Sequence, residues 1–210
     1  MDEQNALAAL ILTRDIMAAI KLRYFLTDGT LLGIVRDNNF IASDSDIDIG
    51  VFAEDFNIFS FGLLASLMRL NGFSHRFLGV WGKHFAVHWT RKNVLVDVSF
   101  YFKNGDQRVS YAMDDTNIFK ITFPADLIET LAPIEFRGHS FTAPKDPRAI
   151  LSYQYGDWSV PRPDWDWKES PLNIARWKKV TLEEKFKSKV SNRVLKLSDR
   201  SVARFLVPHP

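Results

Sequence analysis

Three aspartates at alternate positions are the most chemically informative feature of this sequence. The stretch IASDSDIDIGVF, residues 41–52, contains Asp44, Asp46 and Asp48. Residues two apart in a β-strand point to the same face, so Asp46 and Asp48 would lie roughly 7 Å apart on one side. Two ionised carboxylates at that distance repel each other unless a cation lies between them. Mg²⁺ prefers carboxylate oxygens and shares its coordination shell with phosphate, so it would satisfy both acids; the alternative is a solvated strand end.

A second segment carries residues suited to binding phosphate. In DGTLLGIVR, residues 28–36, Gly29 permits close backbone approach, and Thr30 can cap a helix or bond a phosphate oxygen. The free N–H groups at a helix start attract anions. Arg36, further along the same helix, is a candidate for a forked contact with phosphate. A glycine turn followed by a capping threonine explains the same segment without any binding role.

A third segment places one acid among apolar residues. In NVLVDVSFYF, residues 93–102, Asp97 interrupts a strand-like apolar run. A buried carboxylate is costly unless it is paired, hydrogen-bonded or bound to a metal. Asp97 is therefore either a hydrogen-bond acceptor inside the fold or a third metal ligand on a neighbouring strand.

Hydrophobic periodicity and turn signals predict the elements that would position these residues. Helices are expected at residues 1–22, 30–37, 54–70 and 147–155. Strand-like runs occupy residues 40–41, 47–52, 73–77, 84–89, 94–102, 118–121 and 134–141. Residues 156–170 are rich in Pro and Trp, lack a period and are expected to form an ordered loop. Helices mixed with a run of antiparallel strands indicate an α+β or mixed α/β fold.

Composition excludes several classes of protein and site. The chain of 210 residues is long enough for one substantial domain with an appendage. It has no Cys, which excludes disulfides and thiolate metal sites, and its formal charge of +2 gives no global signal for nucleic-acid binding. Acids at the N-terminus and an interrupted apolar run there argue against a signal peptide and a spanning helix. A cytoplasmic location is expected.

A change in charge near residue 171 divides the chain into a main domain, 1–170, and a basic extension, 171–210, expected to be helical. One interpretation of the extension is a solvated amphipathic helix that covers the core. A second is a surface for anionic lipid-linked glycans, which would place the protein in peripheral contact with the inner face of a membrane. Nucleic-acid contact has the least support, because the basic residues do not accompany a recognisable binding module.

The order of these motifs resembles a known family. DGTLLGIVRDNNFIASDSDIDIGVF, residues 28–52, resembles the signature of the LicD/fukutin family within the nucleotidyltransferase superfamily. KHFAVHWTRKNVLVDVSFYF, residues 83–102, resembles the family's strand pair with its third Asp. YQYGDWSVPRPDW, residues 153–165, resembles its Tyr-Gly-x-x-Trp-x-x-Pro stretch. The resemblance covers residues 5–168 and implies a nucleotidyltransferase-like central mixed sheet flanked by helices.

The resemblance also implies an activity. Members of this family are metal-dependent phosphotransferases that move a phospho-alditol or phosphocholine group from a CDP-linked donor to a hydroxyl of a glycan or lipid-linked glycan. By position, Asp46, Asp48 and Asp97 would hold Mg²⁺ or Mn²⁺, and Asp97 could also take the hydroxyl proton. The resemblance also implies that Gly29 and Thr30 line the donor phosphates, with Arg36 nearby.

Six further residues are candidates for substrate contact. Lys83, His84 and His88 could contact phosphate, although a His in a strand is often structural. Tyr155, Gly156 and Trp158 could wall the donor site, or they could serve packing alone.

This sequence departs from the family pattern just before its acids. Ala42-Ser43 stands where the family commonly has Pro-Trp, and Ser45 stands where it often has another Asp. Ser45 would point away from the face of Asp46 and Asp48, so the acid pair is retained. The rival enzyme is a nucleotidyltransferase that adds NMP to a protein, small molecule or RNA with the same acids. The rival outside enzymes is a non-catalytic binding module.

Overall fold

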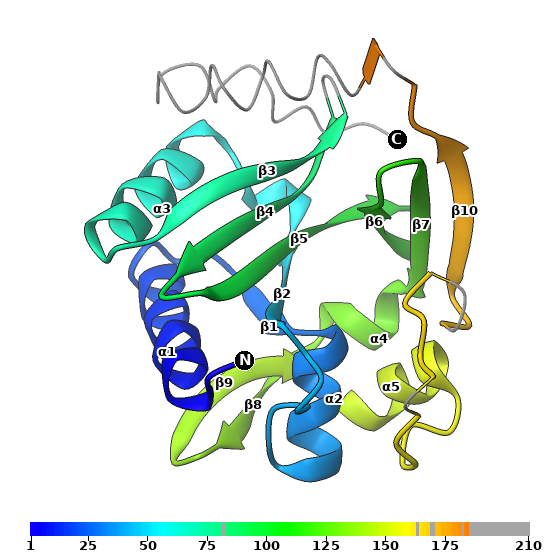
Figure 1. The fold of residues 1–210 in the computed structure, drawn as a ribbon, viewed down its shortest axis with the longest axis horizontal. Coiled ribbons are helices and arrows are strands. Elements are labelled where there is room, and N and C mark those ends of the chain that lie inside the picture. Colours follow the sequence, from blue (N-terminus) through cyan, green and yellow to red (C-terminus); the bar gives the residue numbers. More distant parts are fainter. Residues whose placement is uncertain (81–82, 163, 169–170, 182, 185–210) are drawn as a thin grey trace.

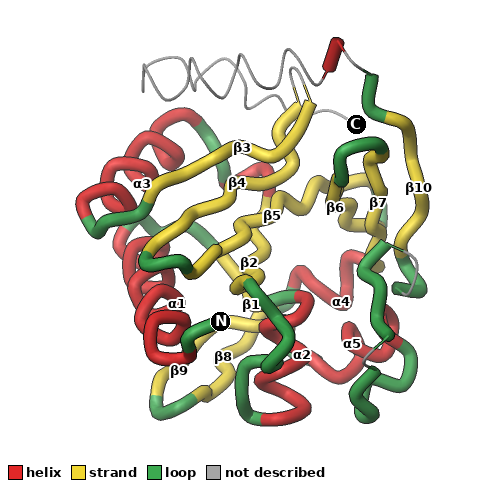
Figure 2. Tube along the Cα trace, in the orientation of Figure 1, coloured by secondary structure: helices red, strands yellow, loops and turns green. Residues whose placement is uncertain are grey.

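The computed structural model describes residues 1–80, 83–162, 164–168, 171–181 and 183–184. Over these residues the fold combines helices with an eight-stranded mixed sheet and a separate two-stranded hairpin, which confirms the predicted α+β class. Helices lie on both sides of the sheet, and the hairpin lies beside the first and second helices (Figures 1 and 2). None of the described helices is long and apolar enough to cross a membrane.

The helices and strands have the following bounds. The helices are α1 Glu3–Ala19, α2 Asp28–Asp37, α3 Ile58–Leu70, α4 Ala125–Glu129 and α5 Pro147–Tyr155, and a 3-10 turn spans Ala53–Asp55. The strands are β1 Tyr24–Leu26, β2 Asp46–Phe52, β3 Ser74–Val80, β4 Lys83–Arg91, β5 Val94–Asn104, β6 Gln107–Met113, β7 Asn117–Pro124, β8 Leu131–Phe136, β9 His139–Pro144 and β10 Ile174–Lys179.

Strand β5 is the centre of the sheet. Its first part pairs with β2 in parallel and with β4 in antiparallel orientation, so the order on that side is β1-β2-β5-β4-β3. Its last residues pair with β6, which continues through β7 to β10. One long strand therefore connects the layer that carries the acids to a second, antiparallel layer.

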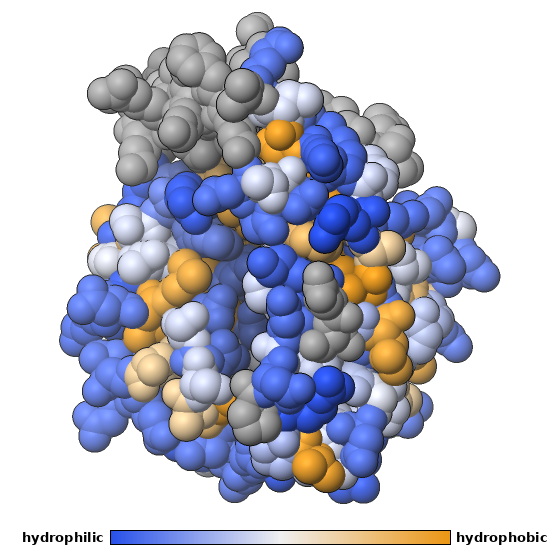
Figure 3. Space-filling model, turned by 45° about the vertical axis from the view of Figure 1, so that its right-hand side comes forward, coloured by the Kyte–Doolittle hydropathy of each residue, from blue (hydrophilic) through white to orange (hydrophobic). Residues whose placement is uncertain are grey.

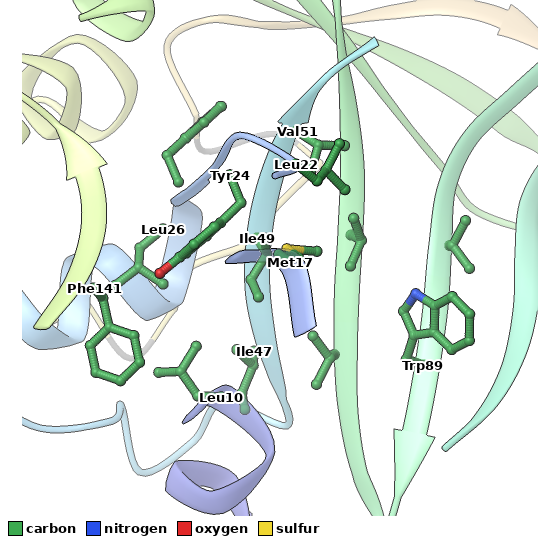
Figure 4. Close-up of a cluster of buried hydrophobic side chains, with 14 of the residues drawn as sticks. Leu10, Met17, Leu22, Tyr24, Leu26, Ile47, Ile49, Val51, Trp89 and Phe141 are labelled. Carbon is green, nitrogen blue, oxygen red and sulfur yellow. The ribbon is translucent and has the colours of Figure 1, made fainter. Parts of the chain in front are cut away.

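Alternating burial in β2 separates an apolar face from an acidic one. Ile47 and Ile49 are fully buried, whereas Asp46 and Asp48 are half-buried. Figure 4 shows Ile47 and Ile49 among apolar side chains from α1, including Leu10. Burial of this apolar face, at about 25 cal/mol per Å², fixes which side of the strand the acids occupy.

Several element boundaries differ from expectation for local reasons. Helix α3 begins at residue 58 rather than 54, because Asn57 caps it in a reciprocal capping box with Ser60. The expected strand at residues 134–141 is the hairpin β8–β9, whose turn residues Arg137 and Gly138 both have positive φ, as in a type I′ turn. Residues 40–41 form no strand; Phe40 is instead buried against the Phe136 ring. Strand β6 and helix α4 were not expected.

The start of the basic extension is a strand, not the expected helix. Residues Ile174–Lys179 form β10, which pairs with β7 and extends the sheet of the main domain. Backbone pairing to an open sheet edge explains the difference, since such an edge offers N–H and C=O groups to a segment of any charge. Residues 185–210, which contain most of the expected helix, lie outside the described residues.

A buried arginine on β6 connects this strand to the 3-10 turn after β2 and to helix α4. The Arg108 side chain on β6 is 4% exposed and bonds both Glu54 oxygens at 2.7 and 2.8 Å. Its Nε also donates to Glu129 at 2.8 Å, and its guanidinium lies 4.8 Å from the centre of the Phe52 ring. The 3-10 turn, β6 and α4 are thus joined through one cation.

Polar side chains predominate on one face of the molecule. The space-filling view shows this face hollowed near its centre, with apolar side chains in small separate groups around it (Figure 3). Single exposed apolar residues are ordinary for a globular protein, whereas a polar hollow is suited to a charged ligand.

Candidate active site

The pairing of β2 with β5 places the three predicted acids on one face of two neighbouring strands. Asp48 and Asp97 are partners in the parallel register, and Asp46 lies two residues before Asp48 on the same face. Neighbouring strands are about 4.8 Å apart, so carboxylates from the two strands share one small region. The sequence predicted the face of each acid, and the parallel register supplies their convergence.

The first turn of α2 is fastened to this acidic face by Thr30. The Thr30 backbone N–H donates to Asp48 Oδ2 at 3.1 Å, and the Asp48 N–H donates to the Thr30 hydroxyl at 2.8 Å. Helix α2 begins at Asp28, two residues before the expected start, and its N-cap is Thr27. Thr30 is therefore not the helix cap; its hydroxyl positions Asp48 instead.

Gly29 makes room for two of the acids. A Cβ added at this position would lie 2.2 Å from Asp44 Oδ2 and 3.2 Å from Asp48 Oδ2. The carboxylates can approach the helix backbone this closely only because residue 29 has no side chain.

We expect Gly29→Ala to fold and to lose most of its activity. The methyl group would displace the Asp44 carboxylate, which is the mobile end of a side chain, so the fold can accommodate it. A displacement of about 1 Å in an active site costs on the order of 10²-fold in rate. Transfer kinetics and thermal unfolding of the variant check this, with Gly62→Ala as a control at an exposed position of α3 where an added Cβ meets nothing within 4 Å. A Gly29→Ala protein with full activity would show that this close approach is not needed.

Two further acids, Asp28 and Asp44, belong to the same cluster. Asp28 has a φ of 45°, and its Oδ1 accepts a hydrogen bond of 2.6 Å from the buried Gln154 side chain on α5. Sequence reasoning assigned a role to neither Asp28 nor Gln154. The position of Asp28 directly before Gly29 was the available signal for it, whereas the contact with Gln154 spans 126 positions and left no local trace.

Burial and neighbouring negative charges raise the pKa values of Asp28, Asp46 and Asp48. Burial raises the pKa of Asp48 well above its usual range, and the negative charges of Asp28 and Asp46 raise it further. Burial, a hydrogen bond with Asp44 and repulsion from nearby acids raise the pKa of Asp46 to about 7. Burial likewise raises the pKa of Asp28. Neighbouring carboxyl groups with raised pKa values are common at functional sites, because a structural role seldom requires carboxylates to be held together.

The donor set fits a hard divalent cation. Asp46, Asp48 and Asp97 offer carboxylate oxygens, and the repulsion among them is the condition that a bound cation relieves. Among the residues that the structure describes, no three Asp, Glu or His side chains are already gathered as a ligand set. Binding of a cation would therefore draw these carboxylates closer together.

The stability of the metal-free protein should fall as pH rises from about 5 to about 8. The folded-state pKa of Asp46 is about 7, above its ordinary value. The contribution of this carboxyl to the free energy of unfolding is therefore full below about pH 4 and is lost as pH rises through 7. Partial solvent exposure reduces the effect to about 1–2 kcal/mol, or roughly 2–8 °C in melting temperature. Thermal unfolding with EDTA measures this, and Mg²⁺ should restore stability at the higher pH. If Asp46→Asn leaves the dependence of melting temperature on pH unchanged, the explanation is contradicted.

The structure places the other predicted residues at different distances from the acids. His88 lies on β4 with its Nε2 3.5 Å from Asp97 Oδ2. The Arg36 guanidinium, in the last turn of α2, pairs with its neighbour Asp37 at 2.8 Å. The backbones of Lys83 and His84 belong to β4, but their side chains lie outside the described residues. Phosphate contact by these residues stays a prediction.

Tyr155 at the end of α5 and the predicted residues Gly156 and Trp158 have different surroundings. Burial raises the pKa of the Tyr155 hydroxyl well above its usual range, and the charges of Asp28 and Asp48 add to the effect. Gly156 ends α5 with a φ of 69°, and the Trp158 Nε1–H donates to Ser152 at 3.0 Å. The pKa of Tyr155 thus responds to the charges of the acids, whereas Trp158 packs against the hydrophobic core.

Comparison with known proteins identifies a matching family model, described as the nucleotidyltransferase domain of LicD/FKTN/FKRP, which covers residues 21–146. An uncharacterised Caenorhabditis elegans protein is 30% identical over 81% of this chain and 48% of its own length. The human ribitol 5-phosphate transferase FKRP is 28% identical over 71% of this chain and 31% of its own length. The human ribitol-5-phosphate transferase FKTN is 29% identical over 72% of this chain and 32% of its own length. This chain thus spans about half or less of these relatives.

Solved structures give a more distant likeness. A crystal structure of ANT(2'')-Ia with adenylyl-2''-tobramycin is 16% identical, with a TM-score of 0.46 over 93% of this chain and 97% of that one. A solution structure of the same antibiotic-resistance factor is 15% identical, with a TM-score of 0.49 over 95% of this chain and 94% of that one.

Proposed function

This chain belongs to the LicD/FKTN/FKRP family of nucleotidyltransferase domains, and we propose that it transfers a phosphate-containing group to a hydroxyl of a glycan. We propose further that the donor is CDP-linked and that the transferred group is a phospho-alditol or phosphocholine. The observation that carries the proposal is the position of Asp46, Asp48 and Asp97 on one face of the paired strands β2 and β5, beside the first turn of α2. The names of FKRP and FKTN as ribitol phosphate transferases support the class of reaction.

The residues of the site have distinct tasks in this proposal. Asp46, Asp48 and Asp97 would hold Mg²⁺ or Mn²⁺, which when bound would neutralise phosphate charge and polarise the reacting phosphoryl group. Thr30 fixes the Asp48 carboxylate, and Gly29 keeps the helix backbone close to the acids. The arrangement lets anionic phosphates approach a cluster that would otherwise repel them.

The proposed chemical step is an in-line displacement. An acceptor hydroxyl oxygen attacks the distal phosphorus of the donor diphosphate, a new P–O bond forms, and the bond to the CMP oxygen breaks. CMP leaves with the electron pair of that bond, and the hydroxyl proton passes to a nearby base. We propose that Asp97, whose Oδ2 lies 3.5 Å from His88 Nε2, receives this proton in addition to binding the metal ion.

The experiment that tests the proposal measures products. The full chain is incubated with Mg²⁺, a candidate glycan and CDP-choline, CDP-ribitol or CDP-glycerol, and CMP release is followed. Release of CMP that depends on the acceptor is expected for one of these donors. Pyrophosphate release from an NTP would instead establish the rival nucleotidyltransferase. Binding of a CDP compound without CMP release would indicate a non-catalytic module.

A further inference from the structure

A single row of polar residues crosses four strands of the sheet. Asp48 on β2 is the register partner of Asp97 on β5, Asp97 is the partner of His88 on β4, and His88 is the partner of Arg76 on β3. Directly paired residues point to the same face, so all four side chains lie on the acidic side. The row thus extends the site from the acids to the edge strand.

The His88 imidazole connects the acid to the arginine. His88 Nδ1 lies 3.4 Å from an Arg76 guanidinium nitrogen, and His88 Nε2 lies 3.5 Å from Asp97 Oδ2. A guanidinium can only donate, so Nδ1 accepts from Arg76, and the proton of the neutral ring is on Nε2, facing Asp97. The position of the Arg76 guanidinium is thereby coupled to the acid cluster.

Arg76 itself is on the open face of the sheet. Its neighbour Phe77 is 2% exposed, and its neighbour His75 packs against the buried Trp89 ring at 4.9 Å, so both point to the core side. Arg76 points the other way and is exposed. Within the described part of the chain, its guanidinium has no carboxylate in ion-pairing distance, in contrast to Arg14, Arg23, Arg36, Arg108 and Arg137.

We propose that Arg76 binds the diphosphate of the donor, with His88 as the residue that positions its guanidinium. This inference deepens the proposed function and rests on it. The site is dominated by carboxylates, so an anionic donor needs cationic groups of the protein in addition to a metal ion. A guanidinium presents a planar fork of donors that matches phosphate oxygens, and it stays charged at every relevant pH. Arg76 provides this fork at the end of the row.

Calorimetric titration of the full chain with CDP and with cytidine, both in the presence of Mg²⁺, tests the inference. Arg76→Ala should weaken CDP binding by about 10- to 100-fold, the usual contribution of a charge-assisted hydrogen bond, and should leave cytidine binding unchanged. Arg76→Lys should retain part of the affinity. The matched control is Lys103→Ala, which removes an exposed cation from β5.

Chemical rescue separates a binding role from a structural one. Added guanidinium ion should restore part of the CDP affinity of Arg76→Ala, and the melting temperature of this variant should match that of the parent. Equal CDP binding by parent and Arg76→Ala would overturn the inference. A raised KM for the glycan acceptor together with unchanged CDP binding would also overturn it, because the guanidinium would then serve the acceptor.

The outcomes also separate this inference from the proposed function. If the parent releases CMP from a CDP-linked donor while Arg76→Ala binds CDP normally, the function stands and the inference fails. If Arg76→Ala loses CDP affinity but the parent transfers nothing from any CDP-linked donor, the inference stands and the function fails. If the parent binds no CDP, both fail.

Discussion

Replacing Asp48 by Asn is expected to abolish transfer and to make the metal-free protein more resistant to heat. Asp48 is the acid most closely held by the scaffold, because Thr30 bonds both its backbone and its side chain. Loss of one charged ligand at the phosphoryl site should reduce the rate by at least about 10³-fold. Asn retains the shape and can still accept the hydrogen bond from the Thr30 N–H.

Most substitutions of a partly buried, hydrogen-bonded residue lower the melting temperature, whereas Asp48→Asn is expected to raise it. Burial and the charges of Asp28 and Asp46 raise the pKa of Asp48, so its ionised form destabilises the folded state at neutral pH. The neutral amide removes that repulsion. Steady-state kinetics and thermal unfolding in EDTA measure both effects, with Asp115→Asn at an exposed turn as the control. An active Asp48→Asn protein, or one that melts well below the parent, would contradict this account of the site.

Replacing Arg108 by Met should cause the largest loss of stability. The substitution leaves the carboxylates of Glu54 and Glu129 without their shared cation, next to apolar residues such as Phe52. Removal of one partner from a fully buried ion pair costs about 3–5 kcal/mol, but the side chains of Glu54 and Glu129 are 44% and 38% exposed and stay partly solvated. We therefore expect a loss of about 2–3 kcal/mol, or roughly 4–12 °C in melting temperature for a chain of this size. Chemical denaturation and calorimetry measure the loss.

A combined variant identifies the cause of this loss. Arg108→Met together with Glu54→Gln and Glu129→Gln should recover part of the stability, since no unpaired carboxylate then remains. Failure to recover any stability would indicate that the loss comes from packing of the arginine stem. A melting temperature of Arg108→Met within about 2 °C of the parent would show that the ionic group contributes little.

The sequence predicted the acidic face of β2 because a period of two is visible in residues 46–49. It also predicted a place for Asp97, since a lone acid in an apolar strand requires a partner. The parallel register that aligns Asp48 with Asp97 was not readable, because it depends on how the intervening strands fold together. Only the family resemblance connected the two motifs before the structure did.

Other features had no local signal in the sequence. Strand β10 is basic and carries no strand-like alternation, and its pairing with β7 comes from an available sheet edge. Arg76 is one arginine among many until the register places it beside His88. Thr30 had the composition of a helix cap, and only the packing of α2 against β2 shows that it bonds Asp48. Long-range contacts decided each of these cases.

Titration with Mn²⁺ in the presence of CDP tests most directly whether the three acids form a metal site. Paramagnetic resonance of free Mn²⁺ gives the stoichiometry and affinity for the parent, for Asp46→Asn, Asp48→Asn and Asp97→Asn, and for the control Asp115→Asn. We expect the parent and the control to bind Mn²⁺ with equal affinity, and each of the three site variants to bind it at least about 10-fold more weakly. Mn²⁺ affinity that is unchanged in all three site variants would contradict the assignment of these carboxylates to a metal site.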